Sequence, residues 1–404
     1  MAHEGHNALH DLLAVRGVTR RDFLKYCGSV AAALGLSETM APQIAAALEG
    51  APKLMPALWL NGGSCTGCTE SIAQVDSPDV ATIVLDYLSI NYFETIMAAA
   101  GEQAEKNIEE TIAKGGYIVI YEGSVMTGQD GNTLLVAGKK GTEILSEAAA
   151  GAAAIIAVGS CAVDGGWVYG YPNPAEATGV QAWLNHEKIK TPVVNLPSCP
   201  VNPEWIVAMV VQLLLVADRD VNAFVEKTEW ITRSYTDRKY GDVDLLMPKG
   251  IFGQSIHDNC PRRGHFENGE FVTEFGSAEE AKGYCLYKMG CKGPQTFTNC
   301  PIVRWNRRTS WCVEAGSPCI GCGGLNWVDN NAPFFKRLSD MQMGDALGNV
   351  QPGTVGAVVG GVAAAALVAH GLGMKAAGRV GDGPPMEDMK KHDRKRLAKK
   401  GGDK

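Results

Sequence analysis

The cysteines of this 404-residue chain constrain its fold more than any other feature. Eleven of the twelve cysteines, with one histidine, divide into three groups of four potential metal ligands, and no group lacks a member. The first group is Cys65, Cys68, Cys161 and Cys199; the second is His257, Cys260, Cys285 and Cys291; the third is Cys300, Cys312, Cys319 and Cys322. Sets of four such ligands are typical of iron–sulfur clusters. We therefore predict three clusters and a role in electron transfer.

Two ligands in these groups, His257 and Cys312, are assigned by arguments of their own. The second group has only three cysteines, and His257, three residues before Cys260, supplies the missing ligand. The third group without Cys312 would hold a three-iron cluster, whereas Cys312 as fourth ligand makes a 4Fe–4S cluster. The alternative for Cys312 is a free buried thiol.

Disulfides and zinc are the competing interpretations of a cysteine-rich chain. Eleven cysteines, once Cys27 is removed with a predicted export signal, are an odd number and do not pair completely. The Cys65–Cys68 and Cys319–Cys322 spacings are too short for ordinary structural disulfides but suit a cluster. Zinc does not require three such sets in one chain. Iron–sulfur clusters are the favoured interpretation.

The composition narrows the classes of protein to which this chain could belong. A hydrophobic content of 46% and a charged content of 20% are typical of a globular protein long enough for two domains. The net charge of −7 argues against general nucleic-acid binding.

Residues 51–230 alternate between short apolar runs and helical segments, which predicts a doubly wound α/β fold with a parallel sheet. Strands are expected at residues 57–60, 81–85, 117–121, 154–158 and 192–196, and helices at 98–114 and 201–216. Ligands of such sheets bind outside the carboxyl ends of the strands. Cys65 and Cys68, Cys161 and Cys199 each follow a predicted strand, so the first group is expected to gather at that edge.

Residues 231–345 show little periodicity and contain the second and third groups. A long segment without regular structure is unusual in a compact protein. Metal binding supplies the stabilisation that a small core lacks. We therefore predict a second, loop-rich cluster domain over residues 231–345.

Both ends of the chain carry predicted targeting segments. Residues 1–50 contain Thr19-Arg20-Arg21-Asp22-Phe23-Leu24-Lys25, an apolar stretch and a small-residue run, which together predict a twin-arginine (Tat) signal peptide. Residues 355–374 carry no charge and are long enough to span a bilayer, so a transmembrane helix is predicted at 353–375, and residues 376–404 form a basic tail. Positive charge marks the cytoplasmic side, which predicts a protein body on the periplasmic side of the inner membrane.

Several short motifs, in order, resemble the small subunit of nickel–iron hydrogenases. The similarity runs from about residue 54 to 335 and is carried by Leu60–Ser71, Gly159–Ala162, Cys199–Pro203, the pair His257 and Cys260, Gly290–Pro294, Cys300–Pro301 and Ser317–Cys322. The related cluster subunit of complex I-type quinone reductases is the alternative family. That relative has neither the C-terminal cluster domain nor the Tat signal, which favours the hydrogenase interpretation.

The resemblance implies a flavodoxin-like N-terminal domain and an order for the clusters. The first group would hold the proximal 4Fe–4S cluster, the third group the medial cluster and the His257 group the distal 4Fe–4S cluster. It further implies a partner large subunit carrying the nickel–iron active site, and a membrane cytochrome b or quinone-reducing subunit that accepts electrons from hydrogen. No catalytic residue is expected in this chain.

Cys312 departs from the commonest family pattern, which has proline and a medial 3Fe–4S cluster. The cysteine resembles the nickel–iron–selenium branch, with a medial 4Fe–4S cluster. Oxygen-tolerant members have extra cysteines beside the proximal cluster, whereas this chain has Gly67, Tyr169 and Tyr171 in those regions. The resemblance thus implies an oxygen-sensitive enzyme.

Overall fold

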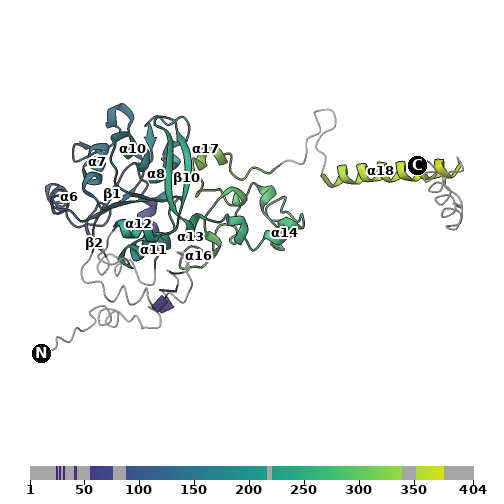
Figure 1. Cartoon of the computed structure of the whole chain (residues 1–404), viewed down its shortest axis with the longest axis horizontal. Coiled ribbons are helices and arrows are strands. Elements are labelled where there is room, and N and C mark those ends of the chain that lie inside the picture. The colour runs from purple at the N-terminus through teal and green to yellow at the C-terminus, as the bar shows by residue number, and fades with distance from the viewer. Residues whose placement is uncertain are drawn as a thin grey trace, which may run out of the picture. The chain divides into compact units, whose positions relative to one another are not determined.

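The computed structural model describes residues 24–25, 27–28, 31, 41–42, 55–75, 88–215, 221–338 and 352–376. The chain divides into two units, residues 1–337 and residues 338–404 (Figure 1). All cysteines of the three groups, and His257, belong to the first unit.

A five-stranded parallel sheet forms the centre of the first unit (Figure 1). Its strands lie in the spatial order β2-β1-β3-β7-β9. If these five strands are numbered from one to five in chain order, their spatial order is 2-1-3-4-5. This is the order found in flavodoxin-like folds. The strands are β1 (Met55–Asn61), β2 (Leu88–Phe93), β3 (Ile118–Glu122), β7 (Ala154–Val158) and β9 (Val193–Leu196).

Helices cover both faces of the sheet, which explains why its strands are apolar on both sides. Every residue of β3, β7 and β9 is buried. On one side lie α6 (Glu102–Lys114), α7 (Gly141–Gly151) and α10 (Val180–Glu187), and on the other lies α11 (Pro203–Leu215) (Figure 1). The predicted doubly wound α/β architecture with a parallel sheet is confirmed.

Shorter elements connect these layers. They are α4 (Gly67–Ile72), β4 (Val125–Met126), the 3-10 helix η3 (Gly128–Gly131), β5 (Leu135–Val136), β6 (Lys139–Lys140), α8 (Gly159–Asp164), α9 (Gly166–Tyr169), β8 (Ala177–Thr178) and α12 (Val221–Lys227).

The edge of the sheet contains a strand that was not predicted from the sequence. The strand beside β1 is formed by Leu88–Phe93, and the predicted strand at 81–85 lies outside the described residues. That segment, Leu-Ser-Ile-Asn-Tyr-Phe, contains polar residues and lacks a continuous apolar run. An edge strand tolerates such a sequence because it has a neighbour on one side only.

Beyond β9 the chain forms a long antiparallel hairpin, β10 (Trp230–Asp237) and β11 (Gly241–Pro248). The side-chain amide of Asn195 in β9 donates to the carbonyl oxygen of Leu246 at 3.2 Å, which joins the hairpin to the edge strand. Residues 231–345 were expected to be loop-rich throughout, and the hairpin is an exception at the start of that region.

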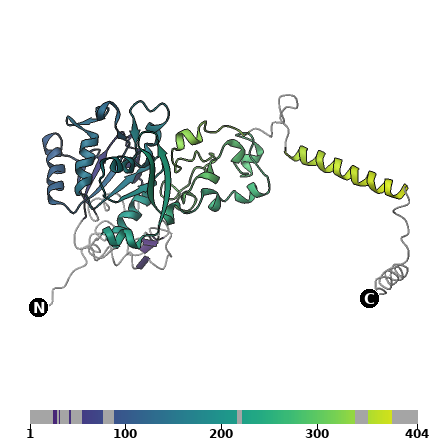
Figure 2. The same cartoon turned by 45° about the horizontal axis from the view of Figure 1, so that its top comes forward.

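Residues 249–338, the described remainder of this region, consist mainly of turns and very short helices and lie beside the sheet (Figure 2). The helices are α13 (Lys249–Phe252), η5 (Ile256–Asn259), α14 (Arg263–Glu267), α15 (Ala278–Ala281), η6 (Tyr287–Met289), η7 (Gly293–Gln295), α16 (Cys300–Val303) and α17 (Trp327–Asn331).

The prediction of a transmembrane helix at 353–375 is wrong. The stretch forms α18 (Pro352–Ala376), a single 25-residue helix (Figure 1). Among the described residues, no helix combines the length and apolar character needed to cross a membrane. The segment is rich in Ala and Gly, which contribute less transfer free energy than Leu, Ile or Phe.

The other predicted targeting segments, the signal peptide and the basic tail, lie almost entirely outside the described residues. The signal peptide at 1–50 lies outside the described residues except for the few positions named above, and the basic tail lies outside them from residue 377 onward.

Candidate metal centres

The carboxyl ends of four strands lie side by side at one edge of the sheet. Asn61 at the end of β1 is paired with Glu122 at the end of β3, Glu122 with Val158 of β7, and Val158 with Leu196 of β9. The loops that follow these strands therefore leave the sheet at the same level. A ligand site built from them needs no further distortion of the fold.

The first cysteine group lies in these loops, as predicted. Cys65 follows β1, Cys68 lies in α4, Cys161 lies in α8 directly after β7, and Cys199 is three residues beyond β9. All four line one small pocket. The structure thus brings together residues that are far apart in the sequence.

Glu122 is a residue of this site that was not predicted from the sequence. It is only 2% exposed, and its carboxylate accepts five hydrogen bonds. The donors are Trp59 Nε1 at 3.2 Å, Ser64 Oγ at 3.0 Å, Cys68 N at 3.0 Å, Thr69 N at 3.1 Å and Thr69 Oγ1 at 2.5 Å. An acidic residue that ends the apolar run Ile118–Tyr121 was the available signal in the sequence.

These bonds fix the loop that carries the Cys65–Cys68 pair. A buried carboxylate is stable when its lone pairs are filled by donors, and here backbone and side-chain donors from the loop and from β1 fill them. Glu122 therefore acts as the anchor to which the beginning of α4 is attached.

Gly159, the first residue of α8, allows the sulfur of Cys68 to approach α8 closely at the same edge of the sheet. It has φ of +82°, and a Cβ atom placed on it would lie 2.5 Å from Cys68 Sγ. A side chain at this position would clash with the sulfur and would also strain the backbone. The absence of a side chain thus keeps the space between Cys68 and α8 open.

The second group lines a separate pocket. His257 lies in η5, Cys260 follows it, and Cys285 and Cys291 approach from a loop and from the segment after η6. The ring of His257 packs edge-on against Phe266, with centroids 4.6 Å apart. The predicted histidine therefore does lie with the three cysteines.

The third group lines a larger cavity of about 370 Å³. Its wall includes Cys300 in α16, Cys312, Cys319 and Cys322. Cys312 is exposed, whereas Cys300 and Cys319 are buried. Thr298 Oγ1 donates to Cys300 Sγ at 3.1 Å, and the backbone nitrogen of Gly321 donates to Cys319 Sγ at 3.3 Å. Cys312 is thus gathered with the other three and is not a distant thiol.

The third group lies between the other two. Cys199 of the first group also lines the cavity of the third. On the other side, the backbone nitrogen of Cys319 donates to Cys291 Sγ of the second group at 3.3 Å. The three groups therefore form a row with the Cys300 group in the middle.

The chemical state of the thiols follows from their surroundings. No disulfide joins any of the eleven cysteines from Cys65 to Cys322, each of which is a free thiol. Burial raises the pKa of Cys199 to about 12 and the pKa of Cys285 to about 11, and it raises the pKa of Cys68 as well. In the absence of a cation these thiols are protonated at neutral pH, so metal binding must displace protons from them.

Within the described part of the chain, no three His, Cys, Asp or Glu side chains come close enough together to hold one metal ion. The ligands of each group are instead spread around a pocket.

A buried acid joins the first and third groups. Asp164, the last residue of α8, is fully buried and accepts hydrogen bonds from Gly166 N at 2.9 Å and from Asn326 N at 2.6 Å. Burial raises the pKa of Asp164 to about 7. The bond to Asn326 ties the helix of Cys161 to the segment four residues after Cys322.

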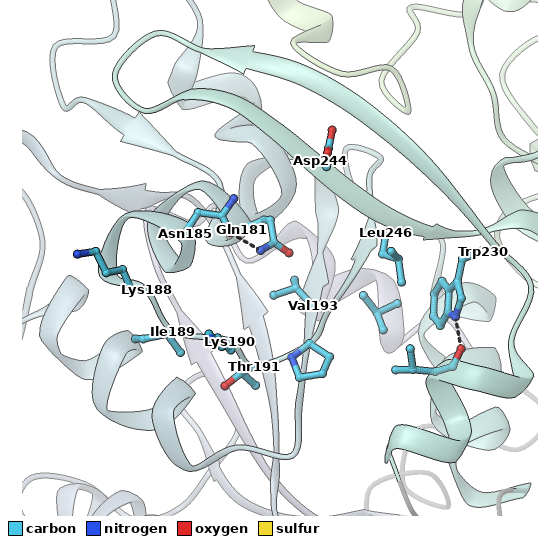
Figure 3. Close-up of a pocket in the computed structure, with 13 residues that line it drawn as sticks. Gln181, Asn185, Lys188, Ile189, Lys190, Thr191, Val193, Trp230, Asp244 and Leu246 are labelled. Carbon is cyan, nitrogen blue, oxygen red and sulfur yellow. Dashed lines mark hydrogen bonds between the residues drawn. The ribbon is translucent and has the colours of Figure 1, made fainter.

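One further cavity, of about 540 Å³, lies at the opposite end of β9 from Cys199 (Figure 3). Gln181 and Asn185 of α10, Val193 and Trp230 line it. None of the twelve predicted ligands lines it. It is therefore separate from the row of cysteine groups.

Two family models match the two segments of the chain that hold the three cysteine groups. Residues 65–213, with the first group, match the family described as NADH ubiquinone oxidoreductase, 20 Kd subunit. Residues 252–335, with the second and third groups, match the C-terminal part of the NiFe/NiFeSe hydrogenase small subunit. The second match names the hydrogenases, and it covers the segment that holds the second and third groups.

Whole-chain relatives agree with this class. The quinone-reactive Ni/Fe-hydrogenase small chain of Wolinella succinogenes is 40% identical over 81% of this chain and 87% of its own length. The periplasmic [NiFe] hydrogenase small subunit 1 of Nitratidesulfovibrio vulgaris is 40% identical over 82% of this chain and 98% of its own. Among solved structures, a recombinant [NiFeSe] hydrogenase from Desulfovibrio vulgaris Hildenborough superposes with a TM-score of 0.61 at 31% identity, covering 70% of this chain and 98% of that one.

The chain belongs to the small-subunit family of nickel–iron hydrogenases. It is the electron-transfer subunit of an oxidoreductase and pairs with a large subunit, in which the active site lies.

Proposed function

We propose that this chain holds three iron–sulfur clusters and relays electrons from hydrogen oxidation in the large subunit to a quinone-reducing membrane partner. The observation that supports this most directly is the row of three pockets, each lined by one four-ligand group. Thiolates that bind different iron atoms of one cluster stand farther apart than ligands of one ion, which suits the spread of these side chains.

In this proposal the first group holds the proximal 4Fe–4S cluster and the second group, with His257, holds the distal 4Fe–4S cluster. The third group holds the medial cluster, through which electrons pass from one to the other. The contacts of Cys199 and Cys291 with the third group support this order.

Cys312 makes the medial cluster a 4Fe–4S cluster in this proposal. Its place on the wall of the same cavity as Cys300, Cys319 and Cys322 supports a role as fourth ligand. If Cys312 were not a ligand, the site would hold a 3Fe–4S cluster.

The electron acceptor and the compartment are also part of the proposal. One relative is named as quinone-reactive and another as periplasmic. Together with the twin-arginine motif at residues 19–25, these names support Tat export and transfer of electrons to a membrane quinone-reducing or cytochrome b subunit.

A Cys300→Ser variant of the heterodimer tests the relay, because it interrupts the middle of the row. Under hydrogen, the first-group cluster should still be reduced, as followed by electron paramagnetic resonance (EPR), while reduction of the second-group cluster should slow by about tenfold or more. Thr309→Ser, a conservative change at an exposed position that lines none of the three pockets, is the control. Reduction of the second-group cluster at the wild-type rate in Cys300→Ser would overturn the proposed route.

A further inference from the structure

Two serines connect the first cysteine group to the third. Ser160 immediately precedes Cys161, and Ser198 immediately precedes Cys199. Both contact the same residue of the third group, Cys322. The two neighbouring groups therefore meet through a pair of side chains that belong to neither.

Ser198 contacts the sulfur of Cys322. Its side chain is only 1% exposed, and its Oγ lies 3.4 Å from Cys322 Sγ. The carbonyl oxygen of Ser198 accepts a hydrogen bond from Ser160 N at 2.8 Å, which holds the segment before Cys199 against α8. The hydroxyl is thus fixed by the backbone of the first group and is directed at a sulfur of the third.

Ser160 contacts the backbone of Cys322. Its Oγ donates to the carbonyl oxygen of Cys322 at 2.7 Å, and its side chain is equally buried. The two serines therefore share their degree of burial and their partner residue, but only Ser198 reaches the ligand atom.

Either atom can donate when Cys322 is a thiol, but a metal-bound thiolate has no proton. In that state only the hydroxyl of Ser198 can be the donor. A hydrogen bond to a ligating sulfur stabilises the more negative, reduced form of a cluster and so raises its reduction potential.

We propose that Ser198 is a positioning residue that raises the reduction potential of the third-group cluster and provides the contact between the first and third groups. This inference rests on the proposed function. The corresponding link to the second group, from Cys319 N to Cys291 Sγ, uses the backbone. Substitution of the Ser198 side chain can therefore alter electron transfer between the first and third groups.

The test is a redox titration of each cluster by EPR in the heterodimer, comparing Ser198→Ala with Ser160→Ala. Ser198→Ala should lower the midpoint potential of the third-group cluster, by a shift equal to about a tenfold change in its oxidised-to-reduced ratio. The other two clusters should keep their potentials. Ser160→Ala removes a hydrogen bond from an equally buried serine to the backbone of Cys322, which does not reach the sulfur, so its third-group potential should match that of the wild type.

An unchanged third-group potential in a Ser198→Ala protein with all three clusters would overturn the inference, as would an equal shift in Ser160→Ala. If Ser198→Ala does not assemble the third cluster, Ser198→Gly is the second variant, because it also removes the hydroxyl without adding bulk. Ser198→Gly must then show the same fall in the midpoint potential of the third-group cluster. Wild-type protein without a third-group cluster would instead contradict the proposed function, so the two failures are distinguishable.

Discussion

The carboxylate of Glu122 accepts the backbone hydrogen of Cys68 at 3.0 Å, which ties the end of β3 to the first ligand loop. The same carboxylate holds Ser64 and Thr69 on either side of that cysteine. The conformation of the loop therefore depends on a residue that is itself no metal ligand in our proposal.

Replacing Glu122 by Gln should destabilise the loop and the cluster that it holds. A glutamine has one acceptor oxygen, so its amide group would face donors and leave some of them unsatisfied, at a cost of about 1–3 kcal/mol for each buried group. We expect a thermal unfolding midpoint several degrees lower and reduced occupancy of the first-group cluster by EPR, to about half or less. Glu70→Gln, the same change at an exposed position of α4, should leave both unchanged. Equal behaviour of the two variants would show that Glu122 is not the anchor.

Gly159→Ala should prevent normal assembly at the first group. The added methyl group would lie 2.5 Å from Cys68 Sγ, and the positive φ of +82° adds backbone strain of about 1 kcal/mol or more. Gly138→Ala is the matched control, because Gly138 has φ of +80° and a methyl group added there would meet nothing within 4 Å. We expect the EPR signal of the first-group cluster to be lost in Gly159→Ala only. Its retention at full intensity would exclude a steric role for this glycine.

Cys312→Ser should remove one iron atom from the third group. Because Cys312 is proposed as the fourth ligand, the iron content of the small subunit should fall from about twelve to about eleven atoms, with the appearance of a 3Fe–4S signal in the oxidised protein. Iron analysis and EPR measure both changes. A wild-type protein that already shows a strong 3Fe–4S signal when freshly isolated would contradict the assignment of Cys312.

Asp164 should make stability depend on pH. Its folded-state pKa of about 7 is above the value of an unfolded aspartate, so the folded protein keeps a proton that the unfolded chain releases. The stabilisation is fully present below the unfolded pKa and is lost as the pH rises toward about 7. Relative to Asp164→Asn, which does not titrate, the wild type should lose on the order of 1 kcal/mol or more between about pH 5 and about pH 8. Asp242→Asn, at an exposed site in the hairpin, is the control.

Thermal unfolding midpoints of the heterodimer across this pH range measure the effect. A constant difference between the wild type and Asp164→Asn at every pH would contradict it.

The sheet and the grouping of the ligands followed from the sequence because each rests on a local signal. Apolar runs such as Ile118–Tyr121 and Ala154–Val158 marked buried strands, and cysteines just after them marked the edge at which strand ends meet. The parallel topology then brought Cys161 and Cys199 together, although 38 residues separate them.

The remaining features depend on tertiary contacts that leave no local pattern. Strand β10 is largely polar after Ile231, and β11 alternates between polar and apolar residues only from Asp242 to Leu245. The hydrogen bond between Leu246 and β9 helps to hold the hairpin in place. The role of Glu122 arises from donors more than fifty residues away. For α18, length and the absence of charged residues at 355–374 favoured a membrane span, and the weakly apolar character of its Ala and Gly residues made that prediction wrong.

The most direct test of the three-cluster relay is the iron and acid-labile sulfide content of the purified heterodimer, measured with the EPR spectrum under hydrogen. We predict about twelve iron atoms and about twelve sulfides in the small subunit, and three reduced clusters, with the third-group cluster magnetically coupled to both of the others. A content of about four iron atoms, or zinc in place of iron, would contradict this account.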